Sequence, residues 1–180
     1  MPLSQTSATT EAGATAFIAL GANLGDRHAN LASAAVALDE TPGITLEAAS
    51  WLYETAPVGG PGGQDVFLNA AVRARTTLQP LELLDRLLAI EEAHRRVRVE
   101  RWGPRTLDLD LLFFGKGMLD DPRLILPHPR LHLRRFVLAP LADIGAGVRH
   151  PALDRTVAEL LAALPPEDID DVRRTTEHWR

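Results

Sequence analysis

Residues 107–111 alternate leucine with aspartate, and this alternation constrains the fold more than any other feature of the 180-residue chain. Apolar and polar residues at a period of two are typical of a strand with one buried face. The leucines can then enter a core, while Asp108 and Asp110 project side by side from the other face, roughly 6–7 Å apart at the backbone. Two adjacent carboxylates repel each other and are depleted in strands, so such a strand usually has a cation beside it.

The chemistry of this aspartate pair favours a hard cation and a phosphate ligand. Mg²⁺ is commonly held by one or two protein carboxylates, and water and substrate phosphates fill its other positions. Arginines that could meet such phosphates lie just upstream, and the turn signal Gly103-Pro104 separates them from the strand. They are Arg95, Arg96, Arg98, Arg101 and Arg105. Carboxylates beside an arginine cluster predict a site for a polyphosphate.

Charge and composition narrow the class of partner. With 19 Lys and Arg against 24 Asp and Glu, the net charge is −5, so no bulk attraction to nucleic acid or to an anionic membrane is expected. Between residues 95 and 105 the balance is reversed, which favours a small anionic ligand. The absence of cysteine excludes disulfides and thiol chemistry. Neither a membrane span nor a signal peptide is recognisable, so a cytoplasmic protein is expected.

Periodicity and turn signals predict the order β-α-β-β-α-β. Strands are expected at 16–20, 44–53, 66–77 and from about 107 to 114, and helices at 27–39, 80–94 and 156–164. The order predicts an α+β ferredoxin-like sandwich, in which helices pack on a central antiparallel sheet; alternation alone would also permit a small doubly wound sheet. Residues 1–14 are expected to be a disordered tail, 15–165 a single domain, and 166–180 a charged tail that either docks or does not.

The stretch from Arg101 to Leu112, Arg-Trp-Gly-Pro-Arg-Thr-Leu-Asp-Leu-Asp-Leu-Leu, resembles the signature of the 6-hydroxymethyl-7,8-dihydropterin pyrophosphokinase family of folate biosynthesis. Further stretches at 17–25, 50–59, 67–70 and 126–141 follow in the family's order and at its approximate spacing, so the similarity covers about residues 15–160. The resemblance implies the ferredoxin-like fold and transfer of pyrophosphate from ATP to the pterin's hydroxymethyl oxygen, with AMP as the other product. It also implies two Mg²⁺ ions held by the aspartate pair. No P-loop sequence is present.

The resemblance further implies roles for individual residues. The catalytic set is Arg96, Arg98, Arg101, Arg105, Asp108 and Asp110, and the two aspartates are also the metal ligands. ATP contacts are implied for Glu91, Arg96, Arg105, Leu111, Arg123, His128 and Arg134. Pterin contacts are implied for Thr55, Val58, Phe67, Asn69, Trp102 and Phe136, with the two phenylalanines as stacking faces and the asparagine at the pyrimidine edge. Arg98 and Arg101 lie in what resembles a mobile loop that closes over the substrates.

Several positions keep a structural alternative. Glu91 could equally be a structural partner for an arginine, Phe67 and Phe136 could be ordinary core residues, and His128 could cap a Pro-rich turn. Arg95 stands where the family often has glycine, so it could simply be solvated.

Other classes of protein also use parts of this pattern. An RNA-binding module with the same fold would carry an aromatic strand signature that is absent here. A nucleotidyl- or glycosyltransferase could also use Asp-x-Asp. That interpretation does not explain why Phe67, Asn69 and His128 stand at positions that match the pyrophosphokinase family. The expected partners are therefore ATP and a pterin, without nucleic acid or membrane, and the expected state is a monomer.

Overall fold

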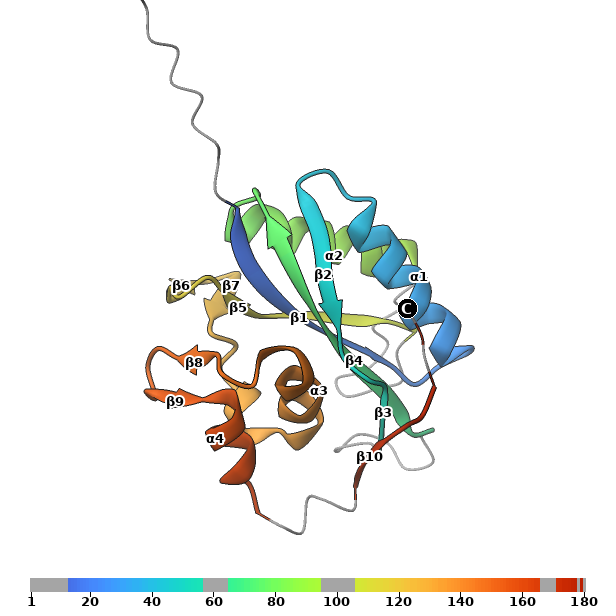
Figure 1. Cartoon of the computed structure of the whole chain (residues 1–180). Coiled ribbons are helices and arrows are strands. Elements are labelled where there is room, and N and C mark those ends of the chain that lie inside the picture. Colours follow the sequence, from blue (N-terminus) through green and yellow to red (C-terminus); the bar gives the residue numbers. More distant parts are fainter. Residues whose placement is uncertain (1–12, 57–64, 95–105, 166–170, 178, 180) are drawn as a thin grey trace, which may run out of the picture.

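The structure is a computed structural model that describes residues 13–56, 65–94, 106–165, 171–177 and 179. An antiparallel sheet lies at its centre, in the order β10-β3-β4-β1-β5, and β2 also pairs with β4 (Figure 1). The elements up to the last central strand are β1 (Ala14–Ala22), α1 (Arg27–Asp39), β2 (Ile44–Ala49), β3 (Tyr53–Thr55), β4 (Phe67–Thr76), α2 (Pro80–Ala93) and β5 (Asp108–Phe114). This order confirms the predicted ferredoxin-like α+β sandwich.

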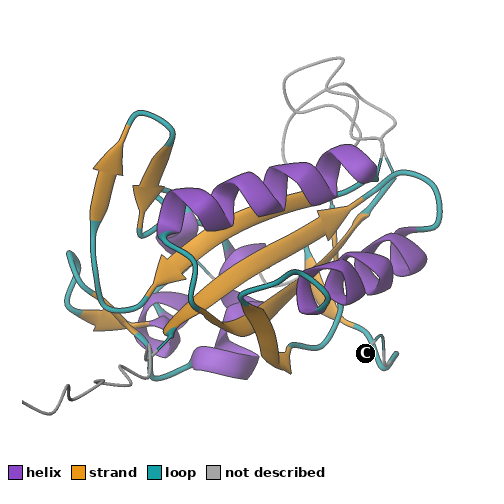
Figure 2. Cartoon of the chain, turned by 90° about the horizontal axis from the view of Figure 1, so that it is seen from above, coloured by secondary structure: helices purple, strands orange, loops and turns teal. Residues whose placement is uncertain are grey.

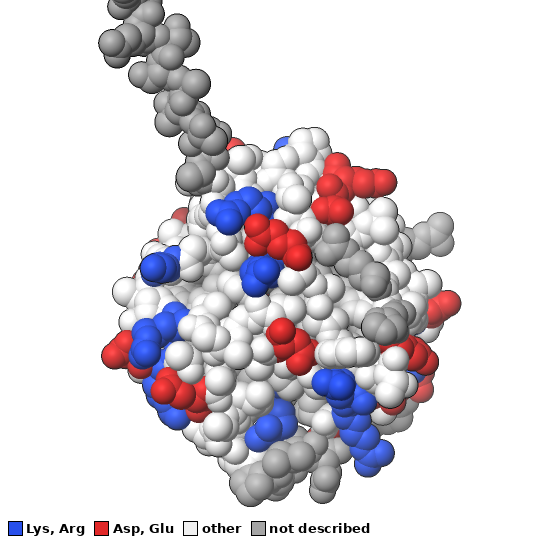
Figure 3. Space-filling view, in the orientation of Figure 1, with Lys and Arg blue, Asp and Glu red and all other residues white. Residues whose placement is uncertain are grey.

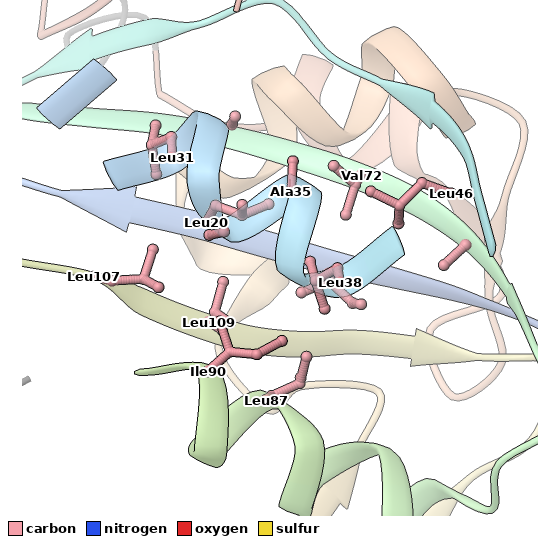
Figure 4. Packing of buried hydrophobic residues seen from close by; sticks show 14 of the residues in the cluster. Leu20, Leu31, Ala35, Leu38, Leu46, Val72, Leu87, Ile90, Leu107 and Leu109 are labelled. Atoms are coloured by element: carbon pink, nitrogen blue, oxygen red, sulfur yellow. The ribbon is translucent and has the colours of Figure 1, made fainter. Parts of the chain in front are cut away.

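The two long helices α1 and α2 cover one face of the sheet (Figure 1, Figure 2). Asp26 begins α1, because its carboxylate accepts the N–H of Ala29 at 2.9 Å. Pro80 occupies the first turn of α2, where no N–H is needed. Apolar residues on both helices meet the leucines of the alternating segment in the main core, which Figure 4 shows from close by. Its labelled members include Leu31, Leu38, Leu87, Ile90, Leu107 and Leu109.

The prediction of a single strand at 44–53 is wrong, because the structure divides it into β2 and β3. The break follows from Ser50, whose Oγ accepts the N–H of Ala71 at 2.8 Å while its own N–H donates to the Ala71 carbonyl at 2.9 Å. The Ser50 hydroxyl thus takes the place of a backbone carbonyl as the acceptor for Ala71, between β2 and β3. β2 pairs with the far half of β4, and β3 pairs with its first three residues. The short strand β3 is thereby placed beside Phe67 and Asn69.

Between residues 115 and 155 short apolar runs alternate with prolines, and this pattern assigns no helix or strand. The chain there forms β6 (Leu119–Asp121), β7 (Leu124–Leu126), a 3-10 turn (Leu131–Leu133), α3 (Arg135–Gly145) and β8 (Arg149–His150), followed by β9 (Arg155–Thr156), α4 (Val157–Ala162) and β10 (Val172–Arg174). Val137, Leu138, Leu141 and Ile144 give α3 an apolar stripe. Pro140 lies inside this helix. Because a proline usually indicates that a helix ends or kinks before it, the sequence pattern does not predict a continuous helix here.

A second core lies on the sheet face opposite α1 and α2. It joins Phe17, Leu112 and Phe113 of the sheet to the apolar residues of α3 and α4. The fold is therefore a sheet with helices on both faces, one layer more than the predicted sandwich requires. None of the helices in the described part of the chain has the length and apolar character that crossing a membrane would require.

Candidate active site

Asn69, Gly21 and Asp108 form one row across β4, β1 and β5. The register pairs Gly21 with Asn69 on one side and with Asp108 on the other. Residues directly opposite each other in antiparallel strands point to the same face. Neighbouring strands are about 4.8 Å apart, so the backbones of Asn69 and Asp108 lie about 10 Å from each other across the glycine. The amide and the carboxylate therefore flank a strip of sheet that carries no side chain at its centre.

Asp110 extends this arrangement by one row. It pairs with Ala19 of β1, and Ala19 pairs with Ala71 of β4. Both aspartates are half-buried, whereas Leu107, Leu109 and Leu111 are buried in the main core. The two carboxylates thus project from the sheet face opposite α1 and α2, beside small residues that leave room for a ligand.

Gly21 was not singled out from the sequence, yet it determines how open this strip is. A Cβ atom built on Gly21 would lie 3.1 Å from Asn69 Oδ1, which is tighter than an ordinary contact. Any side chain here would therefore push the Asn69 amide away or cover the space between it and Asp108. Recognising this from sequence would require the strand register, which the local sequence does not encode.

Asn69 is held by its neighbour on β3. Its Nδ2 donates to Thr55 Oγ1 at 2.8 Å, and both residues are buried. Thr55 lies opposite Phe67 on β4, and Phe67 and Asn69 are two residues apart on that strand. The side chains of all three therefore point to the same face of the sheet. The structure thus brings together three of the predicted pterin contacts. Val58, a fourth, lies outside the described residues.

A hydrogen bond between Tyr53 and Asp143 attaches β3 to α3. Tyr53 is opposite Asn69, and its hydroxyl donates to the Asp143 carboxylate at 3.0 Å. Burial raises the pKa of the Tyr53 hydroxyl, and the Asp143 carboxylate raises it further. Asp143 also accepts the N–H of Trp51 at 3.1 Å. Sequence reasoning missed this pair, which fixes the strand that carries Thr55.

His128 lies next to the aspartate pair. Its backbone N–H donates to the carbonyl of Leu112, at 2.9 Å, which holds the 127–130 turn against β5. Burial lowers the pKa of His128, and the nearby carboxylate of Asp110 and then that of Asp108 act in the opposite direction. Its Nδ1 is 3.2 Å from the backbone nitrogen of Arg130 and accepts its N–H. The neutral ring then carries its proton on Nε2, the nitrogen that remains for a ligand.

Arg134 and Phe136 stand at the start of α3. The Arg134 guanidinium lies 5.6 Å from the centre of the Phe136 ring, within the range of a cation–π contact. Arg134 also lowers the pKa of His128, so its charge acts within the same neighbourhood as the carboxylates. Arg134 therefore brings a positive charge into the neighbourhood of His128, with the Phe136 ring beside it.

Three predicted nucleotide contacts lie elsewhere around β5. Glu91 is 2% exposed, and its carboxylate accepts the N–H of Leu109 at 2.6 Å, which satisfies a donor on an edge strand. The side chain of Leu111 is buried in the main core, so a ligand contact there would involve its backbone. Arg123, after the short strand β6, forms an ion pair with Asp85 of α2. Their contact with a nucleotide stays a prediction.

The predicted phosphate-binding arginines and Trp102 fall in residues 95–105, outside the described part of the chain. These are Arg96, Arg98, Arg101 and Arg105. The segment follows His94, at the end of α2, and Thr106 joins it to the strand that carries Asp108. Within the described ranges, no three His, Asp or Glu side chains gather as a ready metal site.

Comparison with known proteins identifies the family of this chain. The model of the 7,8-dihydro-6-hydroxymethylpterin-pyrophosphokinase (HPPK) family matches residues 17–146. A 2-amino-4-hydroxy-6-hydroxymethyldihydropteridine pyrophosphokinase from Pseudomonas aeruginosa is 47% identical over 154 residues, which are 86% of this chain and 94% of that protein. One of the same name from Bacillus subtilis is 48% identical over 137 residues, 76% of this chain and 81% of the relative.

Solved structures show the same fold at lower identity. A Plasmodium falciparum HPPK-DHPS triple mutant with pteroate is 18% identical, with a TM-score of 0.67 over 90% of this chain. This chain spans 46% of that longer protein. The likeness in structure establishes the fold, and the family match over residues 17–146 together with the bacterial relatives establishes the kinship. The chain belongs to the 7,8-dihydro-6-hydroxymethylpterin-pyrophosphokinase family.

Proposed function

We propose that this chain transfers the terminal pyrophosphoryl group of ATP to the hydroxymethyl oxygen of 6-hydroxymethyl-7,8-dihydropterin and releases AMP. The observation that carries the proposal is the row in which Asn69 and Asp108 flank Gly21 on one sheet face. An amide offers both a donor and an acceptor to the edge of a pterin. A bicyclic ring held there can extend its hydroxymethyl arm over the glycine towards the carboxylates.

Phe67 and Phe136 would hold the faces of the ring. Both are half-buried, which leaves part of each aromatic surface for a ligand. Phe67 shares its sheet face with Asn69, and Phe136 is one of the first residues of α3. Flat polar heterocycles bind well between aromatic side chains with a few hydrogen bonds at their edges. Val58 and Trp102 complete the proposed pterin site from segments outside the described residues.

Asp108 and Asp110 would hold two Mg²⁺ ions that arrive with ATP. The pair fits this role because both carboxylates are half-buried on one strand face, beside Gly21 and Ala19, where side-chain bulk is minimal. Magnesium bound there would neutralise phosphate charge and lower the pKa of the attacking hydroxyl. His128 Nε2 and the Arg134 guanidinium would donate to phosphate oxygens. Arg96, Arg98, Arg101 and Arg105 would supply further positive charge, and Glu91, Leu111 and Arg123 further contacts with the nucleotide.

The proposed partners are these two small molecules, and the proposed state is a cytoplasmic monomer without nucleic acid. The net charge of −5 supports the absence of nucleic acid. On the face shown in Figure 3, acidic and basic side chains are interspersed and form no single basic surface among the described residues. Glu47 illustrates this arrangement, because it forms ion pairs with both Arg73 and Arg75.

The products test the proposal directly. Incubation with ATP, Mg²⁺ and 6-hydroxymethyl-7,8-dihydropterin is expected to give AMP and the pterin diphosphate in equal amounts, because attack at the β-phosphorus expels AMP. Chelation of the divalent metal should abolish turnover. Ion-exchange chromatography separates the nucleotides and pterins. If ADP and a pterin monophosphate were the main products, the proposal would be refuted.

The absence of a side chain at Gly21, between Asn69 and Asp108, gives a second prediction. Replacing Gly21 with alanine is expected to raise the dissociation constant of the pterin about tenfold, because the new methyl group displaces the Asn69 amide, and one lost hydrogen bond costs about that factor. The matched control is Gly117→Ala, whose Cβ would meet one atom, 3.9 Å away. Fluorescence titration measures both variants. Unchanged pterin affinity in Gly21→Ala would show that the ligand does not use this strip.

A further inference from the structure

The segment from Asp171 to Glu177 lies outside the region matched by the family model, yet it extends the central sheet. Within it, β10 pairs antiparallel with β3, and Val172 lies opposite Thr55. Two further hydrogen bonds extend the pairing: the N–H of Ala56 donates to the Asp171 carbonyl at 3.3 Å, and the N–H of Thr175 donates to the Leu52 carbonyl at 2.8 Å. We call residues 171–177 together with Trp179 the C-terminal strap.

Trp179 anchors the strap. It is 7% exposed and belongs to the main core, together with Leu52 and Leu68. Its indole Nε1 donates to the carbonyl of Ser50 at 2.8 Å. Ser50 is the residue whose side chain divides β2 from β3. The strap is therefore fixed at the point where the chain turns into β3.

The strand under the strap carries proposed substrate contacts but has little structure of its own. β3 has three residues, and its other edge pairs with β4 at Phe67 and Asn69. Thr55 on β3 accepts the hydrogen bond that orients the Asn69 amide. So short a strand at a sheet edge frays easily when nothing pairs with its outer side. The strap supplies that second neighbour.

We propose that the C-terminal strap is a positioning element for the pterin: it holds β3, and through Thr55 it holds the Asn69 amide in its binding orientation. This inference rests on the proposed function, because it assigns Asn69 to the pterin. The aspartate pair lies on β5, at the opposite end of the sheet order from β10. Loosening the strap should therefore weaken the pterin side of the site and leave the nucleotide side unchanged.

Thr175 offers a matched pair of variants. Thr175→Pro removes the N–H that donates to Leu52, whereas Thr175→Ala keeps it. If β3 is in place for only part of the time, the apparent affinity for the pterin falls by that fraction. Thr175→Pro is expected to raise the KM for the pterin about three- to tenfold, as for one lost hydrogen bond, and to change the KM for ATP less than about twofold. Thr175→Ala should resemble the parent chain.

Hydrogen exchange tests the strap without using activity. In Thr175→Pro the amides of residues 52–56 are expected to exchange faster than in Thr175→Ala, while those of β1 stay protected. Trp179→Phe provides a second variant that keeps an aromatic ring in the core but loses the N–H donor to Ser50. It should shift exchange and pterin KM in the same direction, with a smaller effect.

The outcomes separate this inference from the proposed function. Failure of the parent chain to form AMP would refute the proposed function, whereas the exchange comparison would still report whether the strap holds β3. Equal rises in the KM for ATP and for the pterin would overturn the positioning role, because they indicate a general loss of folded protein. Faster exchange at residues 52–56 with an unchanged pterin KM would overturn it as well.

Discussion

Replacing Asp108 or Asp110 with asparagine is expected to lower turnover by about 10³-fold or more, because each substitution removes a carboxylate from the proposed metal site. Metal stabilisation of a transition state contributes several kcal/mol, and each 1.36 kcal/mol corresponds to about a factor of ten in rate. Both side chains project from one face of β5, so neither can replace the other without moving the strand. Formation of AMP under saturating ATP and Mg²⁺ measures the effect.

The same variants should fold about as stably as the parent chain. Asparagine keeps the size and shape of aspartate, and both side chains are only half-buried, so little packing is lost. Asp120→Asn is a suitable control, because Asp120 is an exposed carboxylate on β6 and its loss changes the net charge equally. Thermal unfolding without metal compares the three. If both site variants unfolded at much lower temperature than the control, the carboxylates would have a structural role instead.

Local periodicity was sufficient to predict the helices and strands whose apolar faces repeat regularly. The helix at 27–39 is confirmed as α1, and the strand with alternating leucine and aspartate is confirmed as β5. In both, the residues that enter the core are those that the pattern selects. Such elements can be predicted because burial of a regular face outweighs other influences on the local backbone.

Elements that depend on distant partners could not be predicted in this way. The division of β2 from β3 depends on a hydrogen bond between Ser50 and Ala71, which are far apart in the sequence. β10 is three residues of a charged segment, and it becomes a strand because β3 offers an edge and Trp179 a buried anchor. Pairing and burial between remote residues decide these elements, and a local pattern contains neither.

The candidate site shows the same division. The alternation in β5 predicts that Asp108 and Asp110 share a face, and their burial agrees with this. The position of Asp108 in one row with Gly21 and Asn69 depends on the register of three strands, which no local pattern specifies. Before the structure, only the resemblance to a family linked these residues. The roles assigned to them remain proposals that substitution of each residue can test.

Substitution of the arginines in residues 95–105 is expected to give the other large effect on turnover. It also tests whether these arginines act only when a loop closes or simply bind ATP. Arg98 and Arg101 lie between the end of α2 and the turn at Gly103-Pro104, whereas Arg105 stands close to the start of β5. All three lie outside the described residues, so this division rests on the sequence. An arginine that meets phosphate only after a loop has closed contributes chiefly to the transition state. Loss of such a contact can cost about 10³–10⁵ in rate in phosphoryl-transfer enzymes.

Arg98→Ala and Arg101→Ala are therefore expected to lower kcat far more than they weaken ATP binding at equilibrium, whereas Arg105→Ala should weaken both. Single-turnover kinetics give the rate of the chemical step, and calorimetric titration with a non-hydrolysable ATP analogue gives the affinity. The comparison is informative because all three variants lose the same charge, so a difference between them reflects position. Equal losses of nucleotide affinity in all three would mean that the loop is already closed when ATP alone is bound. The expected difference between Arg98 and Arg101 on the one hand and Arg105 on the other would then be wrong.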